Sequence, residues 1–192
     1  TMRCENGLLP DRDRHLARMA ASAAFLGLAF DTEAARAVLA AATAGVTGRV
    51  RLLAAPTGAL AVQVAPLPPP PATPVLVALA PLPVSADDWR LRHKTSDRAF
   101  YDEARRASGA YEVLFVRPDG LITEGSFSNL FVERDGVLLT PPRALGLLPG
   151  VLRARLLDEG RAVEQVLTAE DLRDGFFIGN ALRGLIPARL AF

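Results

Sequence analysis

Lys94 is the only lysine among the 22 lysine and arginine residues of this 192-residue chain. Arginine replaces lysine where a solvated positive charge is enough, but a guanidinium group stays protonated and cannot attack a carbonyl carbon. A lysine amine that loses its proton can form a Schiff base with such a carbon. The uniqueness of Lys94 therefore favours covalent amine chemistry, and the alternative is a residual surface lysine in an arginine-biased protein.

Three segments could build a site around this lysine. Residues 93–98 are polar and charged, and residues 123–129 combine glycine with small hydroxyl residues that let a backbone approach a ligand closely. Residues 148–152 begin a predicted helix, whose free N–H groups suit an anion such as phosphate. Taken singly, each segment could equally be a solvated loop, a polar turn or an ordinary helix start.

Four motifs follow one another along the chain: Lys94, Thr-Glu-Gly-Ser-x-Ser-Asn-Leu-Phe at 123–131, Leu-Pro-Gly at 148–150 and Gly-Asn-Ala at 179–181. Together they resemble the class IV aminotransferase family, whose pyridoxal-phosphate enzymes include branched-chain and D-amino-acid aminotransferases and aminodeoxychorismate lyase. His-Leu-Ala-Arg at 15–18 is similar to the family's N-terminal motif, so the resemblance covers nearly the whole chain. It implies an α+β, two-domain fold of the D-amino-acid aminotransferase type (fold type IV), with the cofactor in the interdomain cleft.

The resemblance also implies roles for single residues. Lys94 would hold pyridoxal 5'-phosphate, and Glu124 would pair with the pyridine nitrogen, because a nearby carboxylate favours the protonated ring, which is the stronger electron sink. Arg18 would bind the cofactor phosphate, whose oxygens suit its planar fork. The other phosphate-binding residues implied are Val151, Leu152, Asn180 and Ala181. No metal site is expected.

Leu152 and Ala181 depart from the family's pattern, because relatives often have a hydroxyl residue at both positions. We therefore expect side-chain contacts to the phosphate to be missing there, which would weaken retention of the cofactor.

Two short segments bear on the reaction type. Residues 93–98 and Asn-Ala-Leu-Arg-Gly at 180–184 are similar to aminodeoxychorismate lyase-like chains. The resemblance implies a lyase that converts 4-amino-4-deoxychorismate to 4-aminobenzoate and pyruvate for folate synthesis, with Lys94 as the general base. Substrate carboxylates could bind Arg3, Arg51 or Arg183. Residues 1–3 resemble the start of the lyase-like part of fusions with the synthase component, so the chain could be a whole protein or part of one.

Two other functions remain open. An aminotransferase for branched-chain or D-amino acids would use the same lysine and cofactor, but would leave the cofactor in its pyridoxamine form after reaction with an amino donor. A non-catalytic paralogue or partner-binding module would only keep the fold. Because family members build each active site partly from a neighbouring subunit, the resemblance also implies a homodimer.

Composition excludes several classes of function. Half of the residues are hydrophobic and the formal net charge is +1, and no long basic run indicates nucleic-acid binding. No apolar stretch reaches membrane-spanning length. Cys4 is the only cysteine, so no disulfide framework is expected, which fits a cytoplasmic protein.

Residue patterns divide the chain into a smaller α+β domain, 1–83, and a larger domain, 84–192. Helices are predicted from residue 12, from a cap at Asp31, over 96–107 and over 150–159, and Thr168 to Asp171 has the spacing of a capping box. Strands are predicted over 49–53, 59–65, 75–80, 111–117, 128–133, 137–140, 163–167, 176–179 and 185–190. The proline-dense run 66–74 is expected to be an exposed loop.

Overall fold

The computed structural model describes residues 1–191, and chain contacts divide it into two compact units, Thr1–Pro70 and Pro71–Phe192. The boundary expected from the sequence lay later, between residues 83 and 84. The strand that separates the two positions, β4 (Val75–Pro81), pairs with strands of the second unit. It belongs there because Val75 and Val77 are buried in that unit's core. Pro81 is the last residue of this strand.

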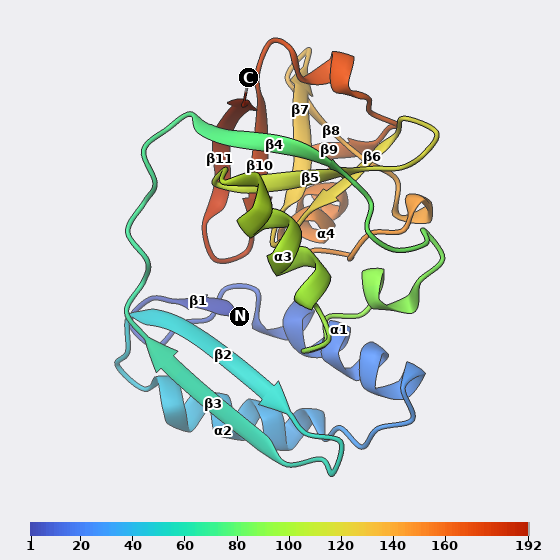
Figure 1. Cartoon of the computed structure of the whole chain (residues 1–192). Helices are drawn as coiled ribbons and strands as arrows, with labels where there is room; N and C mark the ends of the chain where they lie inside the picture. Colours follow the sequence, from blue (N-terminus) through green and yellow to red (C-terminus); the bar gives the residue numbers. More distant parts are fainter. Residues whose placement is uncertain (192) are drawn as a thin grey trace. The chain divides into compact units, whose positions relative to one another are not determined.

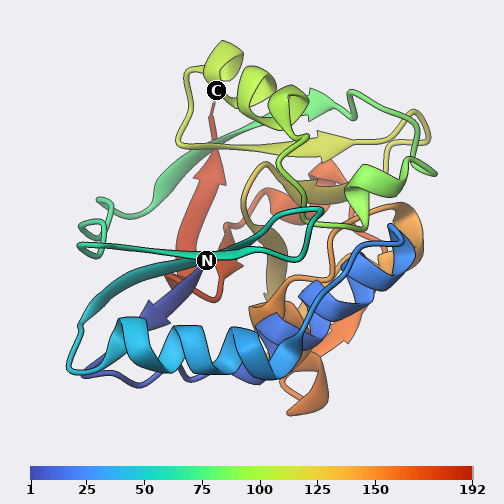
Figure 2. The same cartoon turned by 90° about the horizontal axis from the view of Figure 1, so that it is seen from below.

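The first unit contains a small antiparallel sheet and two helices (Figure 1). Its elements are β1 (Met2–Cys4), α1 (Arg12–Phe25), α2 (Thr32–Thr43), β2 (Gly48–Ala54) and β3 (Leu60–Ala65). The predicted strands 49–53 and 59–65 are confirmed as β2 and β3, which pair as a hairpin from Arg49↔Ala65 to Ala54↔Leu60. Figure 2 shows α2 running along one face of the strands. On that face, Val50 and Leu52 pack with Ala35 and Leu39 in a common apolar cluster.

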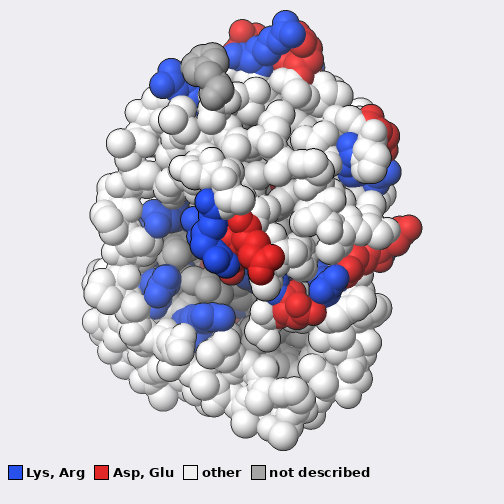
Figure 3. Space-filling model, viewed as in Figure 1, with Lys and Arg blue, Asp and Glu red and all other residues white. Residues whose placement is uncertain are grey.

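The other face of this sheet carries arginines, because successive side chains of a strand alternate between faces. Arg3 lies opposite Arg49 in the β1–β2 register, and Arg51 follows two residues later on β2. Figure 3 shows basic side chains over these strands at the lower left of the view. Glu5 pairs with Arg3 at 2.7 Å, whereas within residues 1–191 no carboxylate pairs with Arg49 or Arg51.

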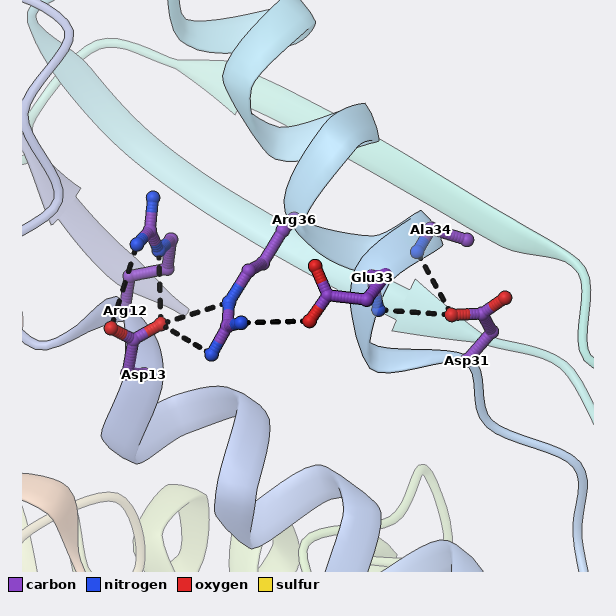
Figure 4. Close-up of polar contacts among 6 residues, drawn as sticks. All are labelled: Arg12, Asp13, Asp31, Glu33, Ala34 and Arg36. Carbon is purple, nitrogen blue, oxygen red and sulfur yellow. Dashed lines mark hydrogen bonds and ion pairs between the residues drawn. The ribbon is translucent and has the colours of Figure 1, made fainter.

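Polar contacts fix the start of α2, as the sequence predicted. The Asp31 carboxylate accepts hydrogen bonds from the backbone N–H groups of Glu33 and Ala34, at 2.9 and 3.0 Å (Figure 4). A cap of this kind stabilises a helix by about 1 kcal/mol. Arg36 of α2 forms ion pairs with Glu33 and with Asp13 of α1. All of these side chains are exposed, so the ion pairs contribute little to stability.

The second unit is built on an eight-stranded mixed sheet in the order β6-β5-β4-β11-β10-β7-β8-β9. Its strands after β4 are β5 (Glu112–Val116), β6 (Ile122–Gly125), β7 (Asn129–Arg134), β8 (Val137–Thr140), β9 (Ala162–Glu164), β10 (Phe176–Asn180) and β11 (Gly184–Leu190). Its helices are α3 (Ala99–Ser108) and α4 (Val151–Asp158), with 3-10 turns at Trp89–Leu91, Arg143–Leu145 and Ala169–Leu172. Figure 1 shows β4 and β5 running across the direction of β10 and β11, as expected of a strongly coiled sheet.

Apolar side chains cover both faces of this sheet. One face holds the largest cluster, which includes Leu114, Ile122, Leu130 and Ile178. On the other face, α3 packs over β5 through the cluster of Tyr101, Val113 and Phe115, and α4 packs over β7 and β8 through the cluster of Leu152, Leu156, Phe131 and Leu138. The side chains of α3 and α4 thus project towards one and the same face.

Most predicted elements of this unit are confirmed, including the capping box at Thr168 and Asp171. The strand predicted over 163–167 is β9, which already ends at Glu164, and two other predictions also differ from the structure. The helix expected from residue 96 begins at Ala99, because residues 95–98 form a loop. In the segment 123–129, for which a polar turn was one interpretation, the residues up to Gly125 belong to β6, which pairs with β5.

Candidate active site

Glu124 owes its orientation to an irregularity in β6. Leu114 pairs with Gly125 and Val116 pairs with Ile122, so β6 has one residue more than β5 between the two pairs. Without this bulge, Glu124 would point to the same face as Ile122, into the large apolar cluster. The extra residue reverses the alternation and turns the carboxylate to the face covered by α3.

The Glu124 carboxylate is buried and hydrogen-bonded on both oxygens. Its Oε1 accepts a hydrogen bond of 2.6 Å from the Tyr101 hydroxyl, and its Oε2 accepts one of 3.5 Å from Asn129 Nδ2. Only 3% of the residue is exposed. Burial raises the pKa of Glu124 to about 7, although Tyr101, Arg98, the backbone N–H of Leu148 and Lys94 each favour the ionised form. A carboxylate of this kind changes charge near neutral pH.

Lys94 lies in the loop that leads into α3, and its side chain is exposed. Its positive charge lowers the pKa of Glu124, so the structure brings the predicted lysine and the predicted carboxylate into electrostatic range. Arg98, at the end of the same loop, lies with its guanidinium carbon 4.5 Å from the centre of the Tyr101 ring. Two cationic side chains of one loop therefore act on one buried carboxylate.

A second buried carboxylate, Glu112 of β5, shapes the loop after Glu124. It accepts hydrogen bonds from the N–H and hydroxyl of Ser126, the N–H of Phe127 and the hydroxyl of Ser128, as well as the N–H of Val113. Gly125 leaves the necessary room, since a Cβ there would lie 2.7 Å from Glu112 Oε2. The sequence analysis missed Glu112, although a glutamate at the start of a strand that is otherwise apolar was a signal for it.

Asn129 joins this region to the start of α4. Its Nδ2 donates a hydrogen bond of 3.2 Å to the carbonyl of Leu148, and a Cβ on Gly150 would lie 1.8 Å from its Oδ1. Gly150 precedes the helix without a capping side chain. The first N–H groups of α4, those of Val151 and Leu152, therefore have no acceptor within the helix and can bind an anion.

The β10–β11 hairpin lies next to this helix start. Gly179 pairs with Asn129 across β10 and β7, and a Cβ on Gly179 would lie 2.9 Å from a methyl group of Leu152. Asn180 uses its Oδ1 to accept from the N–H groups of Leu182 and Arg183, and its Nδ2 donates to the carbonyl of Phe127. The Asn180 side chain thus shapes the hairpin turn that contains Ala181.

The second unit therefore brings Lys94, Glu124, the start of α4 and the β10–β11 hairpin into one region. The Leu152 side chain is buried among apolar residues, so only its backbone can contact a phosphate. Arg183 lies in the same hairpin. Arg3, Arg18 and Arg51 lie in the first unit, on β1, α1 and β2 respectively. The roles of all these residues towards a ligand stay predictions.

Besides Glu112, the sequence analysis also missed Tyr101, which it had assigned only to a helix.

The chemistry of these groups fits pyridoxal phosphate. A buried carboxylate matches a cationic ring nitrogen, uncapped N–H groups match a phosphate, and the one lysine matches an aldehyde.

No helix among residues 1–191 has the length and apolar character needed to cross a membrane.

Comparison with known proteins agrees with this chemistry. The model of the family described as amino-transferase class IV matches residues 1–191. The chain belongs to the class IV aminotransferase family. This family comprises pyridoxal-phosphate enzymes of fold type IV, as the sequence motifs predicted. The family and the α+β fold are therefore confirmed.

Individual family members differ in how much of the chain they match. A crystal structure from Mesorhizobium loti, provisionally named an amino-acid aminotransferase, is 43% identical, covers 99% of this chain and 97% of its own, and has a TM-score of 0.89. A Schizosaccharomyces pombe protein, provisionally named aminodeoxychorismate lyase, is 31% identical over 179 residues, or 88% of this chain and 76% of its own. Branched-chain-amino-acid aminotransferases of Salmonella typhimurium and Escherichia coli are 36% identical over 94 residues, so the match spans only 30% of their length.

The fold also occurs with the cofactor bound. A hypothetical aminotransferase from Mycobacterium tuberculosis, in a pyridoxal-phosphate-bound form, shares the fold with a TM-score of 0.85 at 23% identity, over 98% of this chain and 79% of its own.

Proposed function

We propose that this chain is a pyridoxal-phosphate-dependent aminodeoxychorismate lyase, which releases 4-aminobenzoate and pyruvate from 4-amino-4-deoxychorismate. The observation that carries the cofactor assignment is the buried Glu124 carboxylate within electrostatic range of the chain's only lysine. The choice of a lyase is supported by the extent of similarity. The protein provisionally named as a lyase matches 88% of this chain, whereas the branched-chain aminotransferases match 45%.

The proposed cofactor would be held at three points. Lys94 Nζ would bind its carbonyl carbon covalently, Glu124 would bind its ring nitrogen, and the N–H groups at the start of α4 would bind its phosphate. Arg18 of α1 would add a guanidinium to the phosphate. When bound, the cofactor supplies an electron sink for the carbon that carries the substrate amine.

The protein groups have separate tasks in the proposed reaction. With the substrate amine in place of Lys94 at the cofactor, Lys94 Nζ would be free to remove the proton from the ring carbon that bears the substrate nitrogen. Glu124 would keep a proton on the cofactor ring nitrogen, which would help the ring to accept the electron pair of that carbon. The ether carbon–oxygen bond then breaks, the ring becomes aromatic, and the enol of pyruvate leaves and takes up a proton at carbon. The atoms of the substrate are divided between the two products without any co-reactant.

The arginine face of the first unit supports a substrate with two carboxylates. Arg49 and Arg51 lie on the exposed side of β2, and neither pairs with a carboxylate of residues 1–191. Guanidinium groups bind carboxylates through paired hydrogen bonds. We propose that the substrate carboxylates bind Arg3 or Arg51 of the first unit, or Arg183 of the β10–β11 hairpin.

Covalent labelling tests the cofactor assignment. The purified protein should be yellow after incubation with pyridoxal phosphate, and borohydride should attach the reduced cofactor to Lys94. Lys94→Ala should show no such attachment, and Arg92→Ala is a matched control because it removes a neighbouring cation of the same loop. Peptide mapping that finds the cofactor on the chain's amino terminus would contradict the assignment.

The reaction type is tested with the substrate itself. Aminodeoxychorismate should give equal amounts of pyruvate and fluorescent 4-aminobenzoate without any amino acceptor. The 43% identity to the Mesorhizobium loti protein favours an aminotransferase as the second candidate. In that case branched-chain or D-amino acids would convert the cofactor to its pyridoxamine form, and aminodeoxychorismate would stay unchanged. A protein inactive in both assays would favour the non-catalytic, partner-binding alternative.

A further inference from the structure

The two oxygens of Glu124 have unequal hydrogen bonds. The Tyr101 hydroxyl donates to Oε1 at 2.6 Å, which is a short bond to a carboxylate, whereas Asn129 reaches Oε2 only at 3.5 Å. Tyr101 is thus the closer of these two side-chain donors. Oε2 is the oxygen that can take a stronger donor.

Tyr101 itself is held rigidly in α3. It is completely buried, and its ring contacts Phe115 with centroids 5.1 Å apart and Phe100 with centroids 4.4 Å apart. The Arg98 guanidinium lies over the ring, and its Nη2 donates a hydrogen bond of 2.7 Å to the carbonyl of Ser126. Packing on both sides therefore fixes the hydroxyl before any ligand binds.

We propose that Tyr101 is a positioning residue, which holds Oε1 of the ionised Glu124 and so leaves Oε2 and the proton to the ring nitrogen of the cofactor. The inference rests on the proposed cofactor. Its physical basis is a competition for one proton between a carboxylate and a pyridine nitrogen. A hydrogen bond to the carboxylate makes it the weaker base, and the proton then stays on the ring.

The side chains around Glu124 favour the same ionisation state of the carboxyl group. Tyr101, Arg98 and Lys94 favour the ionised carboxylate, while burial opposes it. Burial and the neighbouring Glu124 charge raise the pKa of Tyr101, so its hydroxyl stays protonated and can only donate to a carboxylate. Of these groups, Tyr101 is the one that hydrogen-bonds to Glu124 directly.

The test compares the titration of Glu124 in three proteins without cofactor. Carboxyl-labelled glutamate gives the carbon NMR signal of Glu124, which is identified by its loss in Glu124→Gln. Tyr101→Phe should raise the titration midpoint by about one pH unit, the equivalent of one hydrogen bond to a charged group. Tyr111→Phe is the matched control, because Tyr111 is the chain's other tyrosine and its buried hydroxyl has no hydrogen-bond partner within residues 1–191.

Two further measurements complete the test. With ring-labelled pyridoxal phosphate, the nitrogen signal should be that of a protonated ring in the wild type and in Tyr111→Phe, and should move towards the unprotonated value in Tyr101→Phe. If Tyr101→Phe does not fold, 3-fluorotyrosine incorporated into Tyr111→Phe replaces it as a probe. Its more acidic hydroxyl should lower the Glu124 midpoint.

The possible failures are distinguishable. A wild-type protein that binds no pyridoxal phosphate would refute the proposed function, and the inference with it. A bound cofactor together with equal Glu124 midpoints in Tyr101→Phe and Tyr111→Phe would overturn only the role of Tyr101.

Discussion

Replacing Glu124 by glutamine should change how the stability of the cofactor-free protein depends on pH. The ordinary pKa of this carboxyl group is 4.5, and burial raises it to about 7 in the folded chain. Because the folded pKa is the higher one, the protonated form stabilises the fold fully below pH 4.5, and this stability is lost as the pH rises through about 7. At 1.36 kcal/mol per pH unit, the loss amounts to about 3 kcal/mol. Glu124→Gln cannot ionise and should not show it.

Urea denaturation at a series of pH values from 4.5 to 8.5 measures this effect as the difference between the wild type and Glu124→Gln, since the other carboxylates contribute equally to both. Glu133→Gln, which alters an exposed residue of β7, is the control and should follow the wild type. Pyridoxal phosphate should reduce the difference, because a cationic ring nitrogen lowers the pKa of Glu124 again. Equal pH dependence in the wild type and in Glu124→Gln without cofactor would show that Glu124 is not buried in the way described.

Three other predictions concern the surroundings of the site. Gly150→Ala should lower the free energy of unfolding by about 1–3 kcal/mol, because its Cβ would displace the Asn129 side chain. The double variant Gly150→Ala, Asn129→Ala should lose less than the sum of the two single losses. Additive losses would exclude the clash. Glu112→Gln should lower the free energy of unfolding, measured by urea denaturation, by about 2–4 kcal/mol, because an amide cannot accept hydrogen bonds from all the donors around this carboxylate. A change below about 0.5 kcal/mol would contradict the role of Glu112 in the loop. We expect the protein to be a homodimer by sedimentation, and a stable monomer with full activity would refute this.

The sequence predicted the elements that depend on local spacing. Asp31 caps its helix, Thr168 and Asp171 form a capping box, and the predicted strands 49–53 and 59–65 occur as β2 and β3. Each of these features involves residues only a few positions apart, and a short stretch of backbone can satisfy them without the rest of the fold. The order of the motifs around Lys94 also sufficed to indicate the family.

The tertiary structure decided what depends on residues far apart in the chain. One extra residue in β6 relative to β5 determines the face to which Glu124 points, and no local pattern shows how two strands will be aligned. The partners of Glu124 and Glu112 come from other elements for the same reason, since Tyr101 lies 23 residues from Glu124 in sequence, and Ser126 lies 14 residues from Glu112. The sequence thus determined which residues could do chemistry. Only the pairing of the strands and the packing of α3 decided that Glu124 is buried near cations and that Glu112 shapes a loop. The reason is that the burial and the hydrogen bonds of a carboxylate, which together set its pKa, arise from the whole fold.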